Sequence, residues 1–505
     1  MRILIDTNII IHREASKVYN KDIGLLFNWI DKLKYEKCVH PLSVEEISNY
    51  QDSEVVDTMK IKIENYNLLK TESEDRDLIL QLRETDKTRN DFIDTSIVKE
   101  VYNNRIGYLI TEDRGIHHKA RVLGVSEKVF KIDDFLEKCV AENPDLKDYN
   151  VLSVRKEYFG NISLSDDFFD SFKEDYSEFE DWFVSKSDKE SYVCVTDGIV
   201  RAFLYLKIEK KEEPYSDITP RFEQKRRLKI GTLKVTSTGY KLGERFLKIV
   251  FDNAIQYKVE EIYVTIFDKR EEQKRLIYLL QDWGFKEWGL KKTANGNEKV
   301  FVRTFGKNLP VSIENPKETF PFISRDTRKY IIKIEPAYHT ELFPDSINTR
   351  ENQDDYTDNE PHRNRIGKVY ISHNKDRHLQ KGDLILVYRM GETSPKRFSS
   401  TITSICIVDE VFDNIPSFED FFQICNRRTF ITKDDLKKKW WNRIPKTRPF
   451  VINLLYAHSL PTPKPTLQKL IDFGIIKDIF SIPRGFIEIN NDQFNTLITF
   501  AYRSK

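Results

Sequence analysis

The sequence predicts a multidomain α/β protein, and three observations support this fold class. First, 505 residues are too many for one hydrophobic core and favour about three domains. Second, short apolar runs that end at an acid, such as Ile3–Ile5 before Asp6, are typical of strands buried on both faces of a parallel sheet. Third, the chain beyond residue 325 is rich in predicted strands.

The composition is that of a folded, soluble protein. Hydrophobic residues make up 39% and aromatic residues 12% of the chain, which is enough for packed cores. The net charge of +1 excludes a globally basic surface but allows local basic patches. No apolar run is long enough to cross a membrane, and no signal peptide opens the chain. We therefore expect a cytoplasmic protein that does not associate with membranes.

The five cysteines are scattered without a CxxC pair, so they predict neither a zinc site nor a disulfide framework. Two polar, proline-bearing stretches, Ala141–Asn150 and Pro310–Pro316, are predicted linkers. They divide the chain into predicted domains at residues 1–140, 150–308 and 325–505.

The first domain begins with a strand that ends at Asp6, followed by charged helix-forming sequence from Ser16 to about Gln81. The further predicted elements are a helix at Asp91–Asn104, strands at Ile106–Ile110 and Val129–Ile132, and a helix at Asp134–Val140. The strand Ile106–Ile110 also runs into acids, at Glu112 and Asp113. Since the carboxyl ends of parallel strands meet at one edge of the sheet, Asp6 and Asp113 are expected to lie together.

Two further acids are expected to join this edge. Asp94 shares a helix face with Asp91, and Glu46 lies in the predicted helical segment Pro41–Ser48. An all-oxygen set made of Asp6, Glu46, Asp94 and Asp113 suits Mg²⁺ or Mn²⁺ and not zinc. The alternative is that these acids cap helices or lie in solvent.

The order of four segments resembles the PIN-domain nuclease family over about residues 1–140: Ile5–Asn8, Ser43–Ile47, Asp94–Ile97 and Ile110–Asp113. The resemblance implies a metal-dependent endoribonuclease, often the toxin of a toxin–antitoxin pair, and thus an antitoxin or inhibitor partner and a homodimer. It implies that Asp6, Glu46, Asp94 and Asp113 hold the metal, with Asp91 as a further acid. Asn8 and Thr111 would orient the first and last carboxylates. His117 and His118 are interpreted as surface or RNA-contacting residues.

The second domain is also α/β. Its predicted strands are Ser191–Val195, Val200–Ile208, Leu228–Val235 and Ile262–Phe267, and its predicted helices are Leu242–Gln256 and one ending near Trp283. The apolar positions of Leu228–Val235 change phase by one residue, which predicts a β-bulge.

A glycine-containing loop, Thr238–Gly243, connects this strand to a helix whose first amides could bind a pyrophosphate. With the bulged strand and Trp283–Glu287, it resembles the GNAT acetyltransferase family over about residues 150–305. The resemblance implies an acetyl-CoA site made of Val235, Gly239, Tyr240, Lys241, Leu242 and Gly243. Lys241 replaces a family glycine, and Leu280 replaces the tyrosine that commonly acts as the acid. A GNAT scaffold retained only for binding is the alternative.

The third domain carries Tyr330–Tyr338, Gly367–Ser372 and Leu379–Tyr388, with a turn at Lys381–Asp383 and a strand at Thr401–Asp409. These segments resemble the PUA-like group that contains ASCH and EVE domains. The resemblance implies a β-barrel with helices that binds RNA or modified bases.

The segment Asn426–Arg448 holds nine Lys or Arg residues and two Asp. Cations beside aromatic rings are what single-stranded RNA recognition requires. The nucleic-acid-binding candidates are Lys437, Lys438, Lys439, Trp440, Trp441 and Arg443. The alternative is a solvated helix face with one tryptophan packed inward. Arg221–Lys229 is a second basic run.

The sequence thus favours a toxin-like or RNA-processing endoribonuclease that requires Mg²⁺ or Mn²⁺ and carries fused acetyl-CoA-binding and RNA-binding domains. The alternative function is a GNAT-type N-acetyltransferase whose flanking domains only bind RNA or a partner. A non-catalytic RNA-binding scaffold is the third interpretation.

Overall fold

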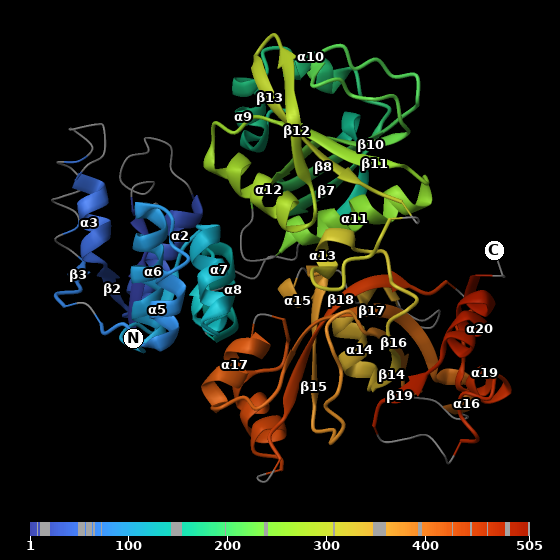
Figure 1. Cartoon of the computed structure of the whole chain (residues 1–505). Helices are drawn as coiled ribbons and strands as arrows, with labels where there is room; N and C mark the ends of the chain where they lie inside the picture. The colour runs from blue at the N-terminus through green and yellow to red at the C-terminus, as the bar shows by residue number, and fades with distance from the viewer. Residues whose placement is uncertain are drawn as a thin grey trace. The chain divides into compact units, whose positions relative to one another are not determined.

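The computed structural model describes residues 1–7, 9–10, 21–48, 56, 63, 66–71, 73–142, 154–196, 198–236, 241–306, 309–346, 360–391, 396–426, 428–444, 447–461, 463–479 and 485–502. The chain forms two units (Figure 1). Unit 1 contains residues 1–148 together with 416–427 and 431–436. Unit 2 contains the rest, that is 149–415, 428–430 and 437–505.

Unit 1 is built on a five-stranded sheet whose neighbouring strands all pair in parallel, as predicted. The strand order is β3 (Asn67–Leu68), β2 (Glu36–Val39), β1 (Arg2–Ile5), β4 (Tyr108–Ile110) and β5 (Val129–Phe130). The helix-forming sequence predicted from Ser16 to about Gln81 contains α2, α3 and the start of α5, but the strands β2 and β3 within it were not predicted. β2 begins with Glu36 and Lys37, and β3 consists of two exposed residues, so neither strand shows an apolar run.

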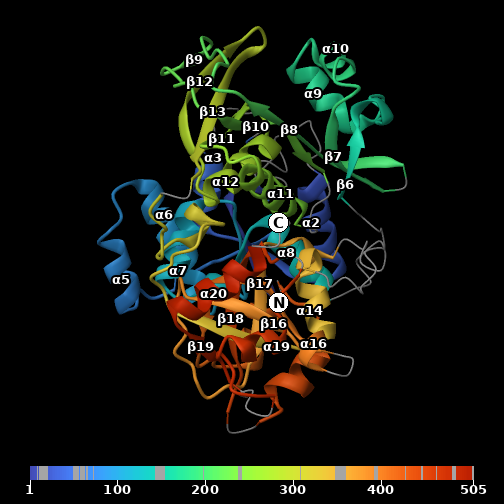
Figure 2. The same cartoon turned by 90° about the vertical axis from the view of Figure 1, so that its right-hand side faces the viewer.

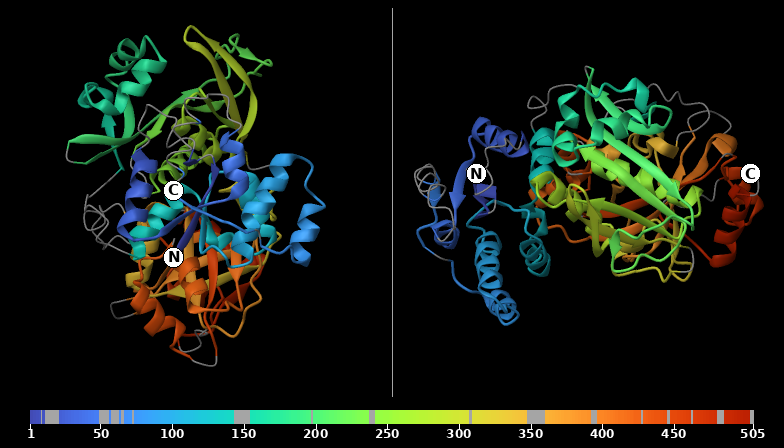
Figure 3. Two further views of the ribbon diagram at one scale, coloured as in Figure 1. Left: turned by 90° about the vertical axis from the view of Figure 1, so that its left-hand side faces the viewer. Right: turned by 90° about the horizontal axis from the view of Figure 1, so that it is seen from above.

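Helices cover both faces of this sheet (Figure 3). One face packs against α2 (Lys21–Lys32) and α8 (Ile132–Glu142). The other packs against α5 (Asp77–Arg83), α6 (Arg89–Tyr102) and α7 (Arg114–Val122), and α3 (Pro41–Ser48) follows β2. Burial on both faces explains why β1 and β4 read as unbroken apolar runs.

A late segment of the chain completes unit 1. Helix α17 (Phe418–Asn426) packs against α8 and the 3₁₀ turn η1 (Ser126–Lys128). The Gln423 side-chain amide donates a buried hydrogen bond of 2.5 Å to the Tyr108 hydroxyl at the start of β4. The first predicted domain therefore folds together with residues that are distant in sequence.

The first sheet of unit 2 has eight strands in the order β6-β7-β8-β10-β11-β13-β12-β9. They are β6 (Val154–Tyr158), β7 (Glu190–Thr196), β8 (Ile199–Glu209), β9 (Ile218–Thr219), β10 (Arg227–Val235), β11 (Glu261–Ile266), β12 (Lys286–Thr293) and β13 (Gly296–Thr304). The bulge predicted in Leu228–Val235 is confirmed, because the β10–β8 register shifts between Ile230 and Thr232.

Helices α11 (Leu242–Gln256) and α12 (Glu271–Asp282) pack on one face of this sheet (Figure 2). The bounds of α11 are the predicted ones. The opposite face carries α9 (Asp170–Asp175) and α10 (Phe179–Val184) over a cluster of phenylalanines, with the 3₁₀ turns η3 (Phe159–Asn161) and η4 (Asp167–Phe169) beside them.

The second sheet of unit 2 has six strands in the order β15-β18-β17-β16-β14-β19. They are β14 (Lys329–Ile334), β15 (Gly367–Ser372), β16 (Leu384–Arg389), β17 (Thr401–Phe412), β18 (Phe450–Ser459) and β19 (Ile487–Ile489). The short helices are α14 (Pro336–Leu342), α15 (Pro361–Asn364), α16 (Lys396–Ser399), α18 (Lys433–Asp435) and α19 (Leu467–Asp472), and α20 (Asn491–Tyr502) follows β19. Within the described ranges β15 does not pair with β19, so a closed PUA-like barrel is not confirmed.

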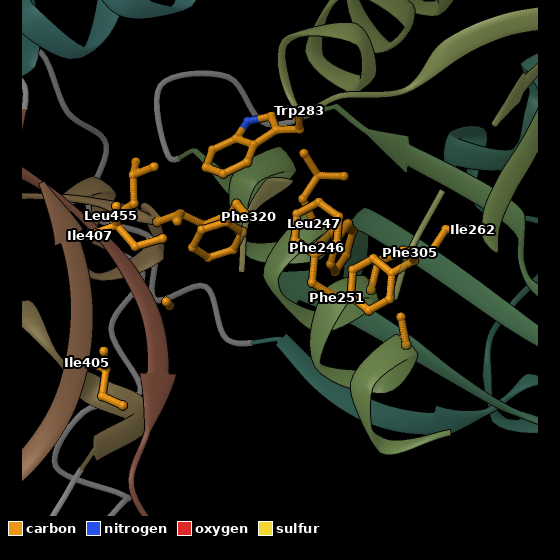
Figure 4. Close-up of a cluster of buried hydrophobic side chains, with 14 of the residues drawn as sticks. Phe246, Leu247, Phe251, Ile262, Trp283, Phe305, Phe320, Ile405, Ile407 and Leu455 are labelled. Atoms are coloured by element: carbon orange, nitrogen blue, oxygen red, sulfur yellow. The ribbon is translucent and has the colours of Figure 1, made fainter. Parts of the chain in front are cut away.

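One hydrophobic core joins the two sheets of unit 2 (Figure 4). It includes Phe246 and Phe251 of α11 together with Ile405 of β17 and Leu455 of β18. The segment predicted as a linker leads directly into this core, since α13 (Pro316–Thr319) is followed by the fully buried Phe320. The second and third predicted domains are thus packed through a common interior.

The five cysteines are all buried free thiols. In the part of the chain that the structure describes, no helix combines the length and apolar character needed to cross a bilayer.

Candidate functional site

Asp6 lies directly after β1 at the carboxyl edge of the unit 1 sheet. Its side chain is 4% exposed, and its carboxylate accepts a 2.7 Å hydrogen bond from the Thr111 hydroxyl. Burial raises the pKa of Asp6 to about 6, and repulsion from Asp113 and Glu46 adds to the rise, while the Thr111 hydroxyl opposes it. Asp6 is therefore a buried acid surrounded by other acids.

Asp113 and Asp94 approach this position from two helices. The Asp113 carboxylate caps α7 by accepting hydrogen bonds from the amides of Gly115 (2.6 Å) and Ile116 (3.1 Å). A Cβ at Gly115 would lie 2.8 Å from Asp94 Oδ2 and 3.0 Å from Asp113 Oδ1. Because a side chain at position 115 would collide with both, glycine allows the Asp94 and Asp113 carboxylates to lie next to this backbone position.

The electrostatics of Asp94 agree with this crowding. Burial raises the pKa of Asp94 to about 7, with Asp113 and Asp6 adding repulsion and the Lys119 ammonium opposing it. Lys119 itself is buried, and its ammonium is 2.7 Å from the Asp86 carboxylate. Glu46, on α3, accepts a 2.8 Å hydrogen bond from the Thr7 hydroxyl. We call Asp6, Glu46, Asp94 and Asp113 the acid cluster.

The other predicted members of this site have different positions. Asp91 closes the capping box of α6, where its carboxylate accepts from the backbone amide and hydroxyl of Thr88 at 2.9 Å. Thr111 bonds the side chain of Asp6 and accepts from the Asp113 amide at 2.9 Å. Asn8 lies outside the described residues. The His117 ring contacts the Thr111 carbonyl at 3.0 Å, and His118 lies on the same helix.

The acid cluster does not fit a metal ion in this arrangement. Among the described residues, no three His, Cys, Asp or Glu side chains are placed to hold one ion. The acids are close enough to repel one another but are not arranged as ligands. The structure therefore gives no support to the predicted Mg²⁺ or Mn²⁺ site.

Two central strands of the first sheet of unit 2, β10 and β11, separate part of the way along their length. We call this place the strand parting. Strands β10 and β11 pair in parallel only from Arg227↔Glu261 to Ile230↔Val264. Beyond this point β10 continues along β8 to Val235, and β11 continues along β13 to Ile266. Their facing backbone edges have no partner strand in the described part of the chain, at the place where Gly231 forms the bulge.

The start of α11 follows the strand parting. Lys241 is the N-cap residue, with φ of 53°, and its side chain makes no capping hydrogen bond. Leu242 is fully buried, and a Cβ at Gly243 would lie 2.9 Å from a methyl of Leu279. Of the predicted acetyl-CoA contacts, Val235, Lys241, Leu242 and Gly243 are thus placed at or beside the strand parting. Gly239 and Tyr240 lie outside the described residues.

The sheet face opposite α11 brings a buried carboxylate to the same region. Glu298 of β13 is 4% exposed and accepts a short hydrogen bond from the Tyr176 hydroxyl. The Tyr176 ring lies 5.3 Å from the ring of Phe267, centroid to centroid, just beyond β11. Sequence reasoning missed Glu298, although Glu298, Val300 and Val302 alternate along one strand face, which signals an acid on an apolar surface.

Helix α9 spans the strand parting on this face. On the β10 side, the Lys234 ammonium donates to the Ser171 hydroxyl (2.7 Å) and the Phe168 carbonyl (2.5 Å). On the β13 side, Tyr176 follows α9 and reaches Glu298. Leu280, at the position of the family tyrosine, is fully buried in the core and cannot serve as an acid.

The two adjacent tryptophans of the basic segment in unit 2 have different surroundings. Trp441 is 6% exposed, whereas the Trp440 ring lies parallel to His373, with 4° between the planes. Lys437, Lys438, Lys439 and Arg443 are exposed around the π-helical turn η7 (Leu436–Trp441). Trp441 is thus packed inward, as the alternative interpretation of this segment expects. We call Lys437–Lys439, Trp440 and His373 the basic–aromatic patch.

No family model and no characterised protein sequence matches this chain. Solved structures similar to parts of it include a mutant form of the ZmASCH protein from Zymomonas mobilis, at 9% identity and TM-score 0.24, covering 35% of this chain and 97% of that one. They also include a GNAT family acetyltransferase from Elizabethkingia anophelis with acetyl-CoA bound, at 12% identity and TM-score 0.22, covering 31% and 99%. A third is Arabidopsis thaliana Naa50 in complex with the bisubstrate analogue CoA-Ac-MVNAL, at 18% identity and TM-score 0.20, covering 30% and 99%. TM-scores this low do not establish an activity, so the function depends on the geometry above.

Proposed function

We propose that the protein is an acetyl-CoA-dependent N-acetyltransferase whose coenzyme binds at the strand parting. The observation that carries this proposal is the separation of β10 and β11 after Ile230 and Val264. Unpaired backbone edges inside a sheet are costly unless an extended polar ligand pairs with them, as a peptide does in β-augmentation. The pantetheine amides of acetyl-CoA have this character, and the first amides of α11, which the Lys241 side chain does not cap, suit its pyrophosphate.

Glu298 is the proposed proton acceptor of the reaction. The acceptor amine attacks the thioester carbonyl, so a C–N bond forms and the C–S bond breaks. The proton lost by the amine passes to Glu298, and the released thiolate takes a proton from solvent. Tyr176 orients the Glu298 carboxylate through its hydroxyl. No tyrosine is available at Leu280 to protonate the thiolate, so solvent supplies that proton.

Titration calorimetry of the full chain with acetyl-CoA tests this proposal. We expect saturable binding in the micromolar range, as is typical of enzyme substrates. Glu298→Gln should still bind acetyl-CoA but lose acetyl transfer to an amine by about 10²-fold or more, with a changed pH profile. Absence of heat with the wild-type protein at high micromolar acetyl-CoA would refute the coenzyme site.

A second candidate function, RNA cleavage by unit 1, is favoured by the acid cluster. The pKa values of Asp6 and Asp94 are raised in part by neighbouring acids, a pattern that concentrates at functional sites. The basic–aromatic patch would bind the RNA, with the lysines at phosphates and the Trp440 ring at a base. The same proposal includes a partner that covers the acid cluster, either an inhibitor protein or a second copy of the chain.

Incubation of the full chain with a structured RNA pool, with and without Mn²⁺, tests the second candidate. Asp6→Asn and Asp113→Asn should abolish cleavage, while Asp91→Asn is the matched control because its carboxylate serves the cap of α6. Loss of cleavage in the control as well, or cleavage that persists in the Asp6 and Asp113 variants, would exclude the acid cluster as the active site.

A further inference from the structure

Helix α11 has two different sides, and only one of them packs on its own sheet. Its apolar side chains, which include Phe246 and Val250, belong to the core of unit 2. Its remaining side carries four charged residues at helical spacing, namely Glu244, Arg245, Lys248 and Asp252. Glu244 and Arg245 have partners outside the helix, whereas Lys248 pairs with Asp252 one turn further along α11.

The partners of the first two residues come from the C-terminal part of unit 2. The Arg245 guanidinium lies 2.6 Å from the carboxylate of Asp345, in the 3₁₀ turn η5 (Pro344–Ser346). The Glu244 carboxylate accepts a 3.1 Å hydrogen bond from the backbone amide of Ile366, just before β15. Both contacts belong to the first turn of α11, which is the turn that follows the strand parting.

The next turn continues the same contact. The Lys248 ammonium lies 5.2 Å from the centre of the Tyr456 ring on β18 and 2.7 Å from the Asp252 carboxylate. Burial alone would raise the pKa of Asp345, but Arg245, with help from Lys248, lowers it to about 2. The charged contact is therefore strong enough to outweigh the desolvation of its own acid.

Apolar packing also connects the start of α11 to the C-terminal part of unit 2. Ile366 is 1% exposed and belongs to the same hydrophobic cluster as Phe246, Phe251 and Leu455. Side chains of β17 and β18 therefore share one buried core with α11. The first turn of α11 is held on one side by apolar packing and on the other by the contacts of Arg245 and Glu244. Such a helix start has little freedom to fray.

We infer that the C-terminal module is part of the acetyl-CoA site, with Arg245 and Glu244 as positioning residues that hold the first turn of α11 in place for the coenzyme. This inference rests on the proposed function. The physical reason is preorganisation: a helix start that binds a pyrophosphate through its amides must be ordered before the ligand arrives, or binding must supply the ordering free energy. Lys241 supplies no side-chain cap, and Glu244 is directed to Ile366, so the order comes from the neighbouring module.

The experiment compares acetyl-CoA binding by the full chain and its variants. Arg245→Glu should raise the dissociation constant for acetyl-CoA by about fivefold or more. The double variant Arg245→Glu with Asp345→Arg restores opposite charges and should recover most of the affinity. The matched control is Arg328→Glu, which breaks a similar ion pair with Asp383 (2.7 Å), formed by the residues just before β14 and β16 and by no residue of α11.

Hydrogen exchange of the amides at residues 242–246 provides a second measurement for each variant. Faster exchange there in Arg245→Glu, with recovery in the double variant, supports the inference. Unchanged affinity in Arg245→Glu overturns it. So does an equal loss in Arg328→Glu, which would indicate general destabilisation. If the wild-type chain itself does not bind acetyl-CoA, the proposed function fails. This outcome differs from failure of the inference, in which the wild-type chain binds acetyl-CoA and Arg245→Glu binds it equally well.

Discussion

Replacing Asp6 by Asn should make unit 1 more stable at neutral and alkaline pH. Asp6 is 4% exposed, and its pKa rises from 3.8 to about 6 in the folded protein. One pKa unit corresponds to about 1.4 kcal/mol, so keeping Asp6 ionised in the folded state costs about 3 kcal/mol. Asparagine carries no charge, and its side-chain oxygen can still accept from the Thr111 hydroxyl. The substitution therefore removes the cost and retains the hydrogen bond.

The pH dependence follows from the direction of the shift. Because the folded pKa of Asp6 lies above the unfolded value, the folded state binds more protons between about pH 4 and pH 6. The stability that comes from this proton is fully present below about pH 4 and is lost as the pH rises through about 6. The advantage of Asp6→Asn should therefore be absent at about pH 4 and approach about 3 kcal/mol at about pH 8.

Hydrogen exchange of the amides in β1 and β4 measures the stability of unit 1 separately from that of unit 2. At about pH 8 a gain of about 3 kcal/mol corresponds to about hundredfold slower exchange in Asp6→Asn. A variant that is less stable than the wild type at this pH would refute the repulsion argument.

Three further substitutions test the packing. Gly284→Ala should destabilise unit 2 by about 2–5 kcal/mol in denaturant unfolding, because Gly284 has φ of 83° and its new Cβ would lie 2.5 Å from the Glu318 carbonyl oxygen. Gln423→Leu should cost unit 1 about 1–3 kcal/mol through the lost hydrogen bond to Tyr108, seen as faster exchange in β4; unchanged exchange would contradict the role of α17. Trp441→Ala should cost about 3–5 kcal/mol because the ring is 6% exposed, and a loss below about 1 kcal/mol would show that its surroundings can collapse.

The elements that the sequence predicted well are those with a strong local pattern. Strands β1 and β4 were recognisable because burial on both faces requires unbroken apolar runs. The bulge of β10 was visible as a one-residue change of phase, and α11 as a helix with an apolar side. In contrast, β2 was missed because Glu36 and Lys37 conceal a strand that only parallel pairing with β1 reveals.

The candidate sites divide in the same way. The approach of Asp6 and Asp113 to one edge was predictable, because both acids follow strands of a parallel sheet, and Asp94 joins them from the helix α6. Their failure to form a set of metal ligands was not, since ligand geometry depends on side-chain positions within a fraction of an ångström. The pairing of Glu298 with Tyr176 joins residues that are 122 positions apart, and no local pattern connects them.

The sequence by itself determined the α/β class, the buried strands β1 and β4, the bulged strand and the helix after it, since each of these leaves a pattern in residues that are close together in the chain. Only the tertiary structure decided that residues 416–427 belong to unit 1, that β10 and β11 separate after Ile230, and that Arg245 meets Asp345. The physical reason is that these contacts are non-local: their free energy appears only when distant segments pack, and it leaves no periodic trace in the chain.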